Sequence, residues 1–253
     1  MLSRLHRKYR HTISCPCSLI QAVGSNRAPR AKTGKTYNWD AASIGGKVGG
    51  AVSKWSDLVN GVAMTPNGKA PVLRAMSNGK VAVDLDNTGM ISTGNLQLNK
   101  QVTVLFAVQH TQNMNTWGSI AHHGNRDNDW ALEHNGVRSD KNVVHWQSKN
   151  DNSGNDITLK QGVVYVLVCR IQGDTRTFVA LGSDGSKTSV SAKGNSIKGK
   201  SDARLGLKRL YFGKSDAREV SHVVMAEVLY YDTALGAAEL TAAQNYMTSK
   251  YLS

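Results

Sequence analysis

Short apolar runs, separated by dipeptides that favour tight turns, recur along most of this chain. Asn-Gly and Asp-Gly supply the positive φ angles of hairpin turns, and they occur at Asn67-Gly68, Asn78-Gly79, Asn135-Gly136 and Asp184-Gly185. The runs are rich in β-branched and aromatic residues: Val81–Leu85, Val102–Gln109, Val143–Gln147, Val163–Ile171, Arg176–Leu181, Arg209–Phe212 and Val223–Tyr231. This pattern predicts an all-β chain folded as a sandwich of two antiparallel sheets.

The last thirty residues predict a strand that leads into a helix. Val223–Tyr231 is the expected strand, and Glu239 lies where the first helical turn favours a carboxylate. Helical spacing places four apolar residues on one face: Leu240, Ala243, Met247 and Tyr251. A short C-terminal helix is therefore expected to cover one face of a sheet.

The order of several motifs resembles that of one known family. They lie at Asn38–Ile44, Val52–Leu58, Pro71–Asp84, Val102–Val108 and Ala226–Tyr251. Together, over residues 37–252, they resemble the LamG-like, concanavalin A-like domains found in phage structural proteins and bacterial surface proteins. The resemblance implies a concanavalin A-like jelly-roll sandwich over residues 37–253. Asp84-Leu85-Asp86-Asn87 departs from the family's Asp-Gly turn, so we expect that corner to be built differently.

Positive charge is concentrated before the expected domain. The net charge is +13, the first acidic residue is Asp40, and eight cationic residues precede it. These are Arg4, Arg7, Lys8, Arg10, Arg27, Arg30, Lys32 and Lys35. We interpret residues 1–36 as a basic arm that docks on other virion or assembly proteins, within an oligomeric assembly. Non-specific binding of nucleic acid is one alternative, and an Arg-rich mitochondrial leader is another.

Three further features bear on the environment and organisation of the chain. No apolar run approaches the roughly 18 to 20 residues that cross a bilayer, so we expect no membrane contact. Cys169 lies in an apolar run and is expected to be a small core residue. The polar segments Asn150–Asp156 and Lys187–Asp202 are expected to be surface loops.

Motifs for common catalytic chemistries are missing, so we expect a protein that is not an enzyme. The glucanases that share the jelly-roll fold carry their acids on one strand as Glu-x-Asp-x-x-Glu, and none of the four glutamates here belongs to such a motif. No Gly-x-Ser-x-Gly nucleophile elbow and no phosphate-binding Gly-x-x-x-x-Gly-Lys-Ser/Thr loop occurs. Catalytic residues are therefore predicted as none.

The densest group of functional side chains lies in residues 117–146, which hold three of the five tryptophans together with Glu133 and His145. An aromatic ring can stack on a sugar while amide, acidic and imidazole groups bond its hydroxyls. The predicted glycan-binding residues are Trp117, His122, Arg126, Asp127, Asp129 and Trp130. The alternative is that Trp130 and Trp146 alternate within strands and fill the core.

We predict no metal ligands and no cofactor in this patch. His122 and His123 are adjacent on an expected strand, so their side chains point to opposite faces and do not converge with His134 on zinc. Asp127-Asn128-Asp129 resembles the start of a calcium loop, but no glycine and distal glutamate follow at the required spacing. Calcium is kept as the alternative to an absent cofactor.

The resemblance and the arm together lead to a prediction of function. We expect a non-enzymatic virion structural protein, on the capsid or tail, that displays its jelly-roll domain and engages host glycans. A free-standing lectin-like adhesion module at the bacterial surface, or secreted, is the second hypothesis. A mitochondrial structural protein with a basic leader is the third.

Overall fold

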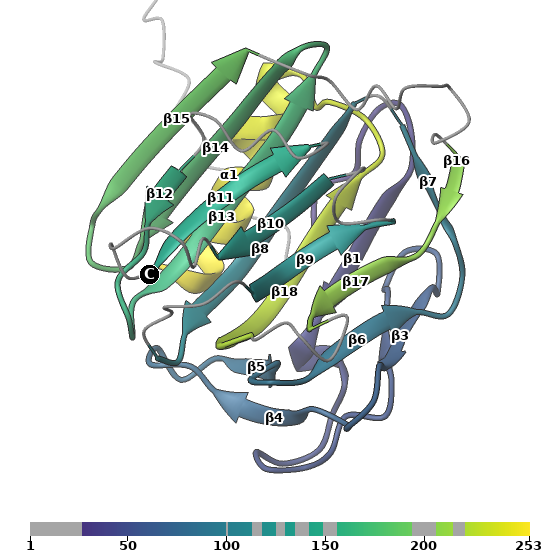
Figure 1. Ribbon diagram of the computed structural model, residues 1–253, viewed down its shortest axis with the longest axis vertical. Helices are drawn as coiled ribbons and strands as arrows, with labels where there is room; N and C mark the ends of the chain where they lie inside the picture. The colour runs from purple at the N-terminus through teal and green to yellow at the C-terminus, as the bar shows by residue number, and fades with distance from the viewer. Residues whose placement is uncertain are drawn as a thin grey trace, which may run out of the picture.

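The computed structural model consists of two antiparallel sheets stacked face to face, with one helix on the outside of the back sheet (Figure 1). The structure describes residues 27–253 except residue 100 and the segments 113–117, 125–129, 135–141, 149–155, 194–205 and 215–220. The prediction of an all-β sandwich with a C-terminal helix is confirmed. The expected runs form strands because each alternates its side chains between two layers.

The back sheet has eight strands in the order β15-β14-β13-β8-β18-β5-β4, with β1 also paired to β18. Their bounds are β1 Thr36–Asp40, β4 Val72–Ala75, β5 Val81–Asp84, β8 Val102–His110, β13 Val164–Gln172, β14 Thr175–Gly182, β15 Lys187–Lys193 and β18 Val223–Tyr231. A 3-10 turn, Ala41–Ser43, follows β1.

The front sheet has eight strands in the order β12-β11-β10-β9-β17-β6-β3-β2. Their bounds are β2 Trp55–Ser56, β3 Ala63–Pro66, β6 Gly89–Ser92, β9 Gly118–His123, β10 Trp130–His134, β11 Val143–Ser148, β12 Asp156–Thr158 and β17 Leu210–Gly213. A separate pair joins β7, Leu96–Leu98, to β16, Gly206–Lys208.

The main core lies between the two sheets and contains most of the large aromatic residues. Trp39 meets Phe212 edge-on with ring centroids 5.5 Å apart, and Trp130 lies 5.0 Å from Trp146. Cys169 is buried in this core, as expected, and is a free thiol. Aromatic contacts of this kind add to the stabilisation that burial of apolar area already provides.

A second apolar layer lies between the back sheet and the helix α1, Ala237–Tyr251. Ala243, Met247 and Tyr251 are buried on the predicted helical face, and Leu240 packs beside them partly buried. The strands β8 and β18 therefore have apolar neighbours on both faces, which explains why their sequences are almost unbroken apolar runs.

A buried carboxylate fixes the helix on the sheet. Glu227 of β18 accepts hydrogen bonds from the hydroxyls of Tyr251 and Tyr246, at 2.8 and 3.0 Å. Lys250 Nζ lies 2.7 Å from Glu227 and 2.7 Å from Asp40. Burial raises the pKa of Glu227, whereas Lys250 opposes that shift. Burial and the adjacent Glu227 raise the pKa of Tyr246 to about 12.

Residues 28–36, which we assigned to the arm, pack on the helix side of the domain. Ala28 and Ala31 lie against the apolar layer under α1, and the Tyr231 hydroxyl donates to Pro29 O at 2.8 Å. The Lys32 N–H donates to Glu239 Oε1 at 2.7 Å, which helps to lower the pKa of Glu239. We call residues 27–35 the strap. The rest of the expected arm, residues 1–26, lies outside the described residues.

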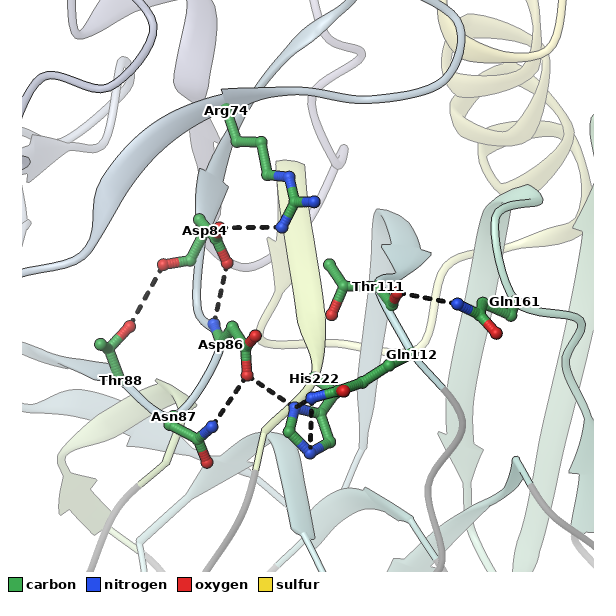
Figure 2. A network of polar contacts seen from close by, with 9 residues as sticks. All are labelled: Arg74, Asp84, Asp86, Asn87, Thr88, Thr111, Gln112, Gln161 and His222. Carbon is green, nitrogen blue, oxygen red and sulfur yellow. Dashed lines mark hydrogen bonds and ion pairs between the residues drawn. The ribbon is translucent and has the colours of Figure 1, made fainter.

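The corner after β5 lacks the Asp-Gly turn of the LamG-like family that the sequence resembles. Asn87 adopts φ 51°, a left-handed conformation that asparagine tolerates better than most residues. Asp86 Oδ1 accepts from Asn87 Nδ2 at 3.0 Å and pairs with His222 Nδ1 at 2.6 Å (Figure 2). The amide of Gln112 lies 3.0 Å from His222 Nε2. These contacts tie the corner to the start of β18 and the end of β8.

The expectation of a surface loop over Lys187–Asp202 is wrong for its first part. Lys187–Lys193 is the edge strand β15, paired residue by residue with β14. The Asp184-Gly185 turn, with Gly185 at φ 78°, folds the chain back onto β14, so backbone pairing rather than burial forms this strand. Asp156, expected at the end of a loop, begins β12. Among the described residues, no helix has the length and apolar character needed to span a bilayer.

Candidate functional site

The inner face of the front sheet packs against the core, and its outer face has polar side chains. Trp130, Leu132 and Trp146 point into the core, so the alternation of a strand directs their neighbours Glu133 and His145 outward. Register places four outward residues side by side on adjacent strands. We call them the polar row: Ser119 of β9, Glu133 of β10, His145 of β11 and Asp156 of β12.

The centre of the polar row is closed off from solvent. Glu133 is 2% exposed and His145 is 0% exposed, and Glu133 Oε2 lies 3.6 Å from His145 Nε2. Ser119 is also completely buried, and its hydroxyl has no hydrogen-bond partner among the described residues. Ionisable groups kept on a sheet face away from the apolar core cost folding free energy, and such groups concentrate at functional sites.

A second row runs parallel to the polar row and contains an aromatic pair. The His122 ring stacks on the Tyr211 ring with centroids 4.4 Å apart and an interplanar angle of 11°. His122 Nδ1 lies 3.1 Å from the Gly124 carbonyl oxygen, which can only accept, so Nδ1 carries the proton. In the neutral imidazole, Nε2 is then the nitrogen that can accept one.

Only the Tyr211 ring of the aromatic pair is partly accessible, because His122 is 3% exposed. Tyr211 is half-buried, as are Ile91 and Thr65, which continue the same row across β6 and β3. The front sheet therefore offers an open strip beside the closed polar row. The strip thus combines a stacked aromatic ring with polar side chains one row away.

The structure separates the predicted glycan-binding residues. His122 lies on the outer face, at the aromatic pair. Trp130 lies in the core between the sheets, 0% exposed and within 6.2 Å of Tyr230 between ring centroids. The alternative for Trp130, that it fills the core, is what the structure shows, and it presents no ring face to a ligand. Trp117, Arg126, Asp127 and Asp129 lie outside the described residues.

The histidine pair behaves as expected for adjacent residues on a strand. His122 faces outward, whereas His123 points into the core, where its Nδ1 lies 3.2 Å from the Tyr230 hydroxyl. The two imidazoles therefore do not share a ligand. In the described part of the chain, no three side chains of metal-binding type converge. The calcium alternative at Asp127-Asn128-Asp129 falls on segments that the structure does not describe.

Four of the cations assigned to partner docking lie on the strap, and all four are exposed: Arg27, Arg30, Lys32 and Lys35. The strap lies on the helix side, so the front-sheet face and these cations are on opposite sides of the molecule (Figure 1). Arg4, Arg7, Lys8 and Arg10 lie outside the described residues.

Sequence reasoning missed part of the candidate site. Glu133 and His145 belong to the dense patch of residues 117–146 but were not among the predicted ligands, and Asp156 was assigned to a loop. Tyr211 is 89 residues beyond His122 in the chain, yet strand pairing makes them neighbours. The only local signal was the alternation of polar and apolar residues in each strand.

Comparisons with known proteins give a likeness of fold. No family model matches the chain, and no curated protein matches it. The sialidase of Trypanosoma rangeli matches with a TM-score of 0.57 at 10% identity, over 85% of this chain and 33% of its own. A GH54 α-L-arabinofuranosidase soaked with a cyclic sulfate inhibitor matches with a TM-score of 0.59 at 10% identity, over 79% of this chain and 51% of its own. The chain thus spans a third to a half of these proteins.

These likenesses correct one expectation. We expected a protein that is not an enzyme, and the comparisons contradict this, because the matching structures are sialidases and arabinofuranosidases. The absence of familiar catalytic motifs was a weak argument, since carboxylates on neighbouring strands can meet without sharing a motif. Identities of 10 to 12% establish the fold alone, an all-β sandwich of the jelly-roll kind.

Proposed function

We propose that the protein binds carbohydrate on the outer face of its front sheet. The observation that carries the proposal is the Tyr211–His122 stack, 4.4 Å between centroids, beside a row of polar side chains. The apolar face of a sugar ring would lie on Tyr211, and its hydroxyls would meet the polar side chains of the two rows that are only partly buried, such as Thr65 and Asp156. Trypanosoma rangeli sialidase in complex with sialic acid shares the fold, which supports a sugar as ligand.

The test is a glycan array probed with the full chain. Tyr211→Ala removes the ring and is expected to lower affinity at least about tenfold, whereas Tyr211→Phe keeps the ring and should retain most of the binding. Loss in both variants would indicate that the hydroxyl, rather than stacking, is recognised. Binding unchanged in Tyr211→Ala, or no binding by the folded chain, would refute the proposal. Repeating the array with EDTA tests the calcium alternative.

A second candidate function is cleavage of the bound glycan. Glu133 and Asp156 are on the same row two strands apart, which places their backbones ~9.6 Å from each other at the usual strand spacing. Carboxyl groups that lie ~6.5–9.5 Å apart are typical of inverting glycosidases, so cleavage would require side-chain carboxyls at that separation and a Glu133 carboxyl, now 2% exposed, that becomes accessible to the glycan. New reducing ends, formed by the full chain and lost in both Glu133→Gln and Asp156→Asn, would support cleavage. Binding without any new reducing ends would leave recognition alone.

The finer assignments stay predictions. The LamG-like, concanavalin A-like assignment rests on the ordered motifs, with the jelly-roll likeness as support. A place in a virion, on the capsid or tail, rests on the basic arm and on that resemblance. The lectin-like module and the mitochondrial protein remain its alternatives. An assembly protein should lose its place in the particle when residues 1–26 are deleted, while its glycan binding persists.

A further inference from the structure

A pocket of about 270 Å³ lies on the helix side of the back sheet, away from the front-sheet face. Its polar wall consists of five residues. They are Arg74 from β4, Ser77 from the following turn, Gln109 from β8, Thr111 directly after β8, and Gln161 from the turn before β13. Val224 and Met76, which belong to the apolar layer under α1, form its apolar side. The pocket therefore borders the part of the sheet that α1 covers.

Hydrogen bonds between three chain segments hold this wall in place. The Ser77 N–H donates to Gln109 Oε1 at 2.8 Å, and the Ser77 hydroxyl donates to Gly162 O at 3.0 Å. Gln109 Nε2 donates to the same carbonyl at 3.0 Å, and Gln161 Nε2 donates to Thr111 O at 3.0 Å. A wall fixed in this way loses little conformational entropy when a ligand enters.

At neutral pH, the pocket wall contains one charged side chain. Arg74 is its one permanently charged lining residue. The other ionisable lining residue, His110, is neutral because burial, and then the neighbouring His222, lowers its pKa to about 4. Arg74 Nη1 donates to Asp84 Oδ2 at 3.2 Å, with the Arg74 side chain 49% exposed (Figure 2). A guanidinium has five N–H donors, so this contact occupies a small part of its capacity.

An unsatisfied hydroxyl lies in the same wall. Thr111 Oγ1 is inaccessible to solvent and has no hydrogen-bond partner among the described residues. Figure 2 shows Arg74 on one side of the start of β18 and Thr111 with Gln161 on the other. Because this oxygen is covered in the structure, Thr111 contributes to the wall without offering its hydroxyl to a ligand.

We propose that this pocket binds a small carboxylate. One carboxylate can accept two N–H bonds from Arg74, in the bidentate geometry that guanidinium favours. The Asp84 carboxylate competes with the ligand for the N–H groups of Arg74, so it limits the affinity of the pocket for the ligand. An uncharged molecule of the same shape lacks the charge-assisted bonds and is bound more weakly. The inference is independent of carbohydrate binding on the front sheet.

The test is an amide NMR titration of the full chain with acetate, and with acetamide as the neutral isostere. Acetate is expected to give saturable shifts at Ser77, Thr111 and Gly162, and Arg74→Gln should weaken its binding about tenfold or more. Asp84→Asn removes the competing charge and should tighten binding severalfold. Arg30→Gln, a matched change on the exposed strap, should leave the affinity unchanged.

Several results would overturn the proposal. Equal binding of acetate and acetamide would show that charge is not recognised. Undiminished acetate affinity in Arg74→Gln, or weaker binding in Asp84→Asn, would remove the assigned roles of these two residues. Absence of saturable shifts at roughly 0.1 M acetate would show that the pocket holds water only. Arg74 is 49% exposed, and Asn keeps the shape of Asp at position 84, where the side chain is 14% exposed, so both variants are expected to fold.

Discussion

At the scale of single residues, His110 illustrates how burial sets the charge of a side chain. It is 1% exposed at the end of β8, and its pKa is lowered to about 4, first by burial and then by His222. An unfolded histidine titrates near 6.5. Between these values the unfolded chain binds the extra proton. The contribution of His110 to the unfolding free energy is therefore fully present above pH 6.5, and it is lost as the pH falls toward 4.

We predict that His110→Gln flattens this dependence. A shift of this size is linked to about 3 kcal/mol of unfolding free energy between pH 6.5 and 4. Urea unfolding of the wild type and the variant at pH 7, 5.5 and 4.5 measures the difference. The difference in unfolding free energy between the wild type and His110→Gln should become smaller, or change sign, as the pH falls. Two parallel pH profiles would show that His110 is not held neutral.

At the same scale, the tryptophans show what composition alone leaves undecided. Trp130 and Tyr211 are both aromatic residues on front-sheet strands, but Trp130 is fully buried and Tyr211 is half-buried on the other face. A shift of one position along a strand exchanges the two faces. The composition of the patch did not show that Trp130 is a core residue, nor that an aromatic residue outside the patch, Tyr211, lies on the outer face.

At the scale of elements, α1 depends on a polar contact inside an apolar layer. Burial of Ala243 and Met247 orients the helix, and the Tyr251 hydroxyl donates to Glu227 at 2.8 Å. A buried carboxylate that loses a donor keeps its desolvation cost without compensation. The hydrogen bond to Glu227 of β18 thus fixes the last turn of the helix on the back sheet.

We therefore predict that Tyr251→Phe costs about 1–2 kcal/mol of unfolding free energy. Tyr211→Phe is the matched control, because no hydrogen bond of the Tyr211 hydroxyl is found among the described residues. Chemical denaturation of both variants gives the comparison. Equal stability of the two would mean that Tyr246 and Lys250 satisfy Glu227 by themselves.

The edge strand β15 shows where element prediction failed. Its sequence Lys187–Lys193 is polar and exposed, so neither apolar periodicity nor burial signals a strand. Pairing with β14 through the Asp184-Gly185 turn supplies the backbone hydrogen bonds instead. Lysine at both ends of an exposed edge also disfavours pairing with other chains.

At the scale of the whole molecule, the strap makes the domain larger than the motifs suggested. Its residues Ala28 and Ala31 pack under α1, and the backbone N–H groups of Lys35 and Lys32 donate to Asp232 and Glu239. The Pro29 carbonyl oxygen also accepts a hydrogen bond from the hydroxyl of the buried Tyr231. The change in composition near residue 36 marks where acidic residues begin, and it is not the point at which packing on the domain begins.

Two truncations test the contribution of the strap. A chain that begins at residue 36 is expected to be less stable than one that begins at residue 27 by about 2–3 kcal/mol, since at least three hydrogen bonds and the packing of two alanines are lost. Thermal unfolding of the two proteins side by side measures this. Equal melting temperatures would show that the strap only rests on the surface.

By itself, the sequence determined the fold class, seven of the strands, the hairpin turns at Asn78-Gly79 and Asp184-Gly185, the closing helix and the buried Cys169. These follow from local periodicity and from turn residues, which act over a few positions. Only the tertiary structure decided that Glu133, His145 and Asp156 form one row, that Tyr211 stacks on His122, and that Arg74 and Thr111 share a pocket. Those neighbours are set by pairing between distant strands, where a shift of one residue would turn each side chain to the opposite face.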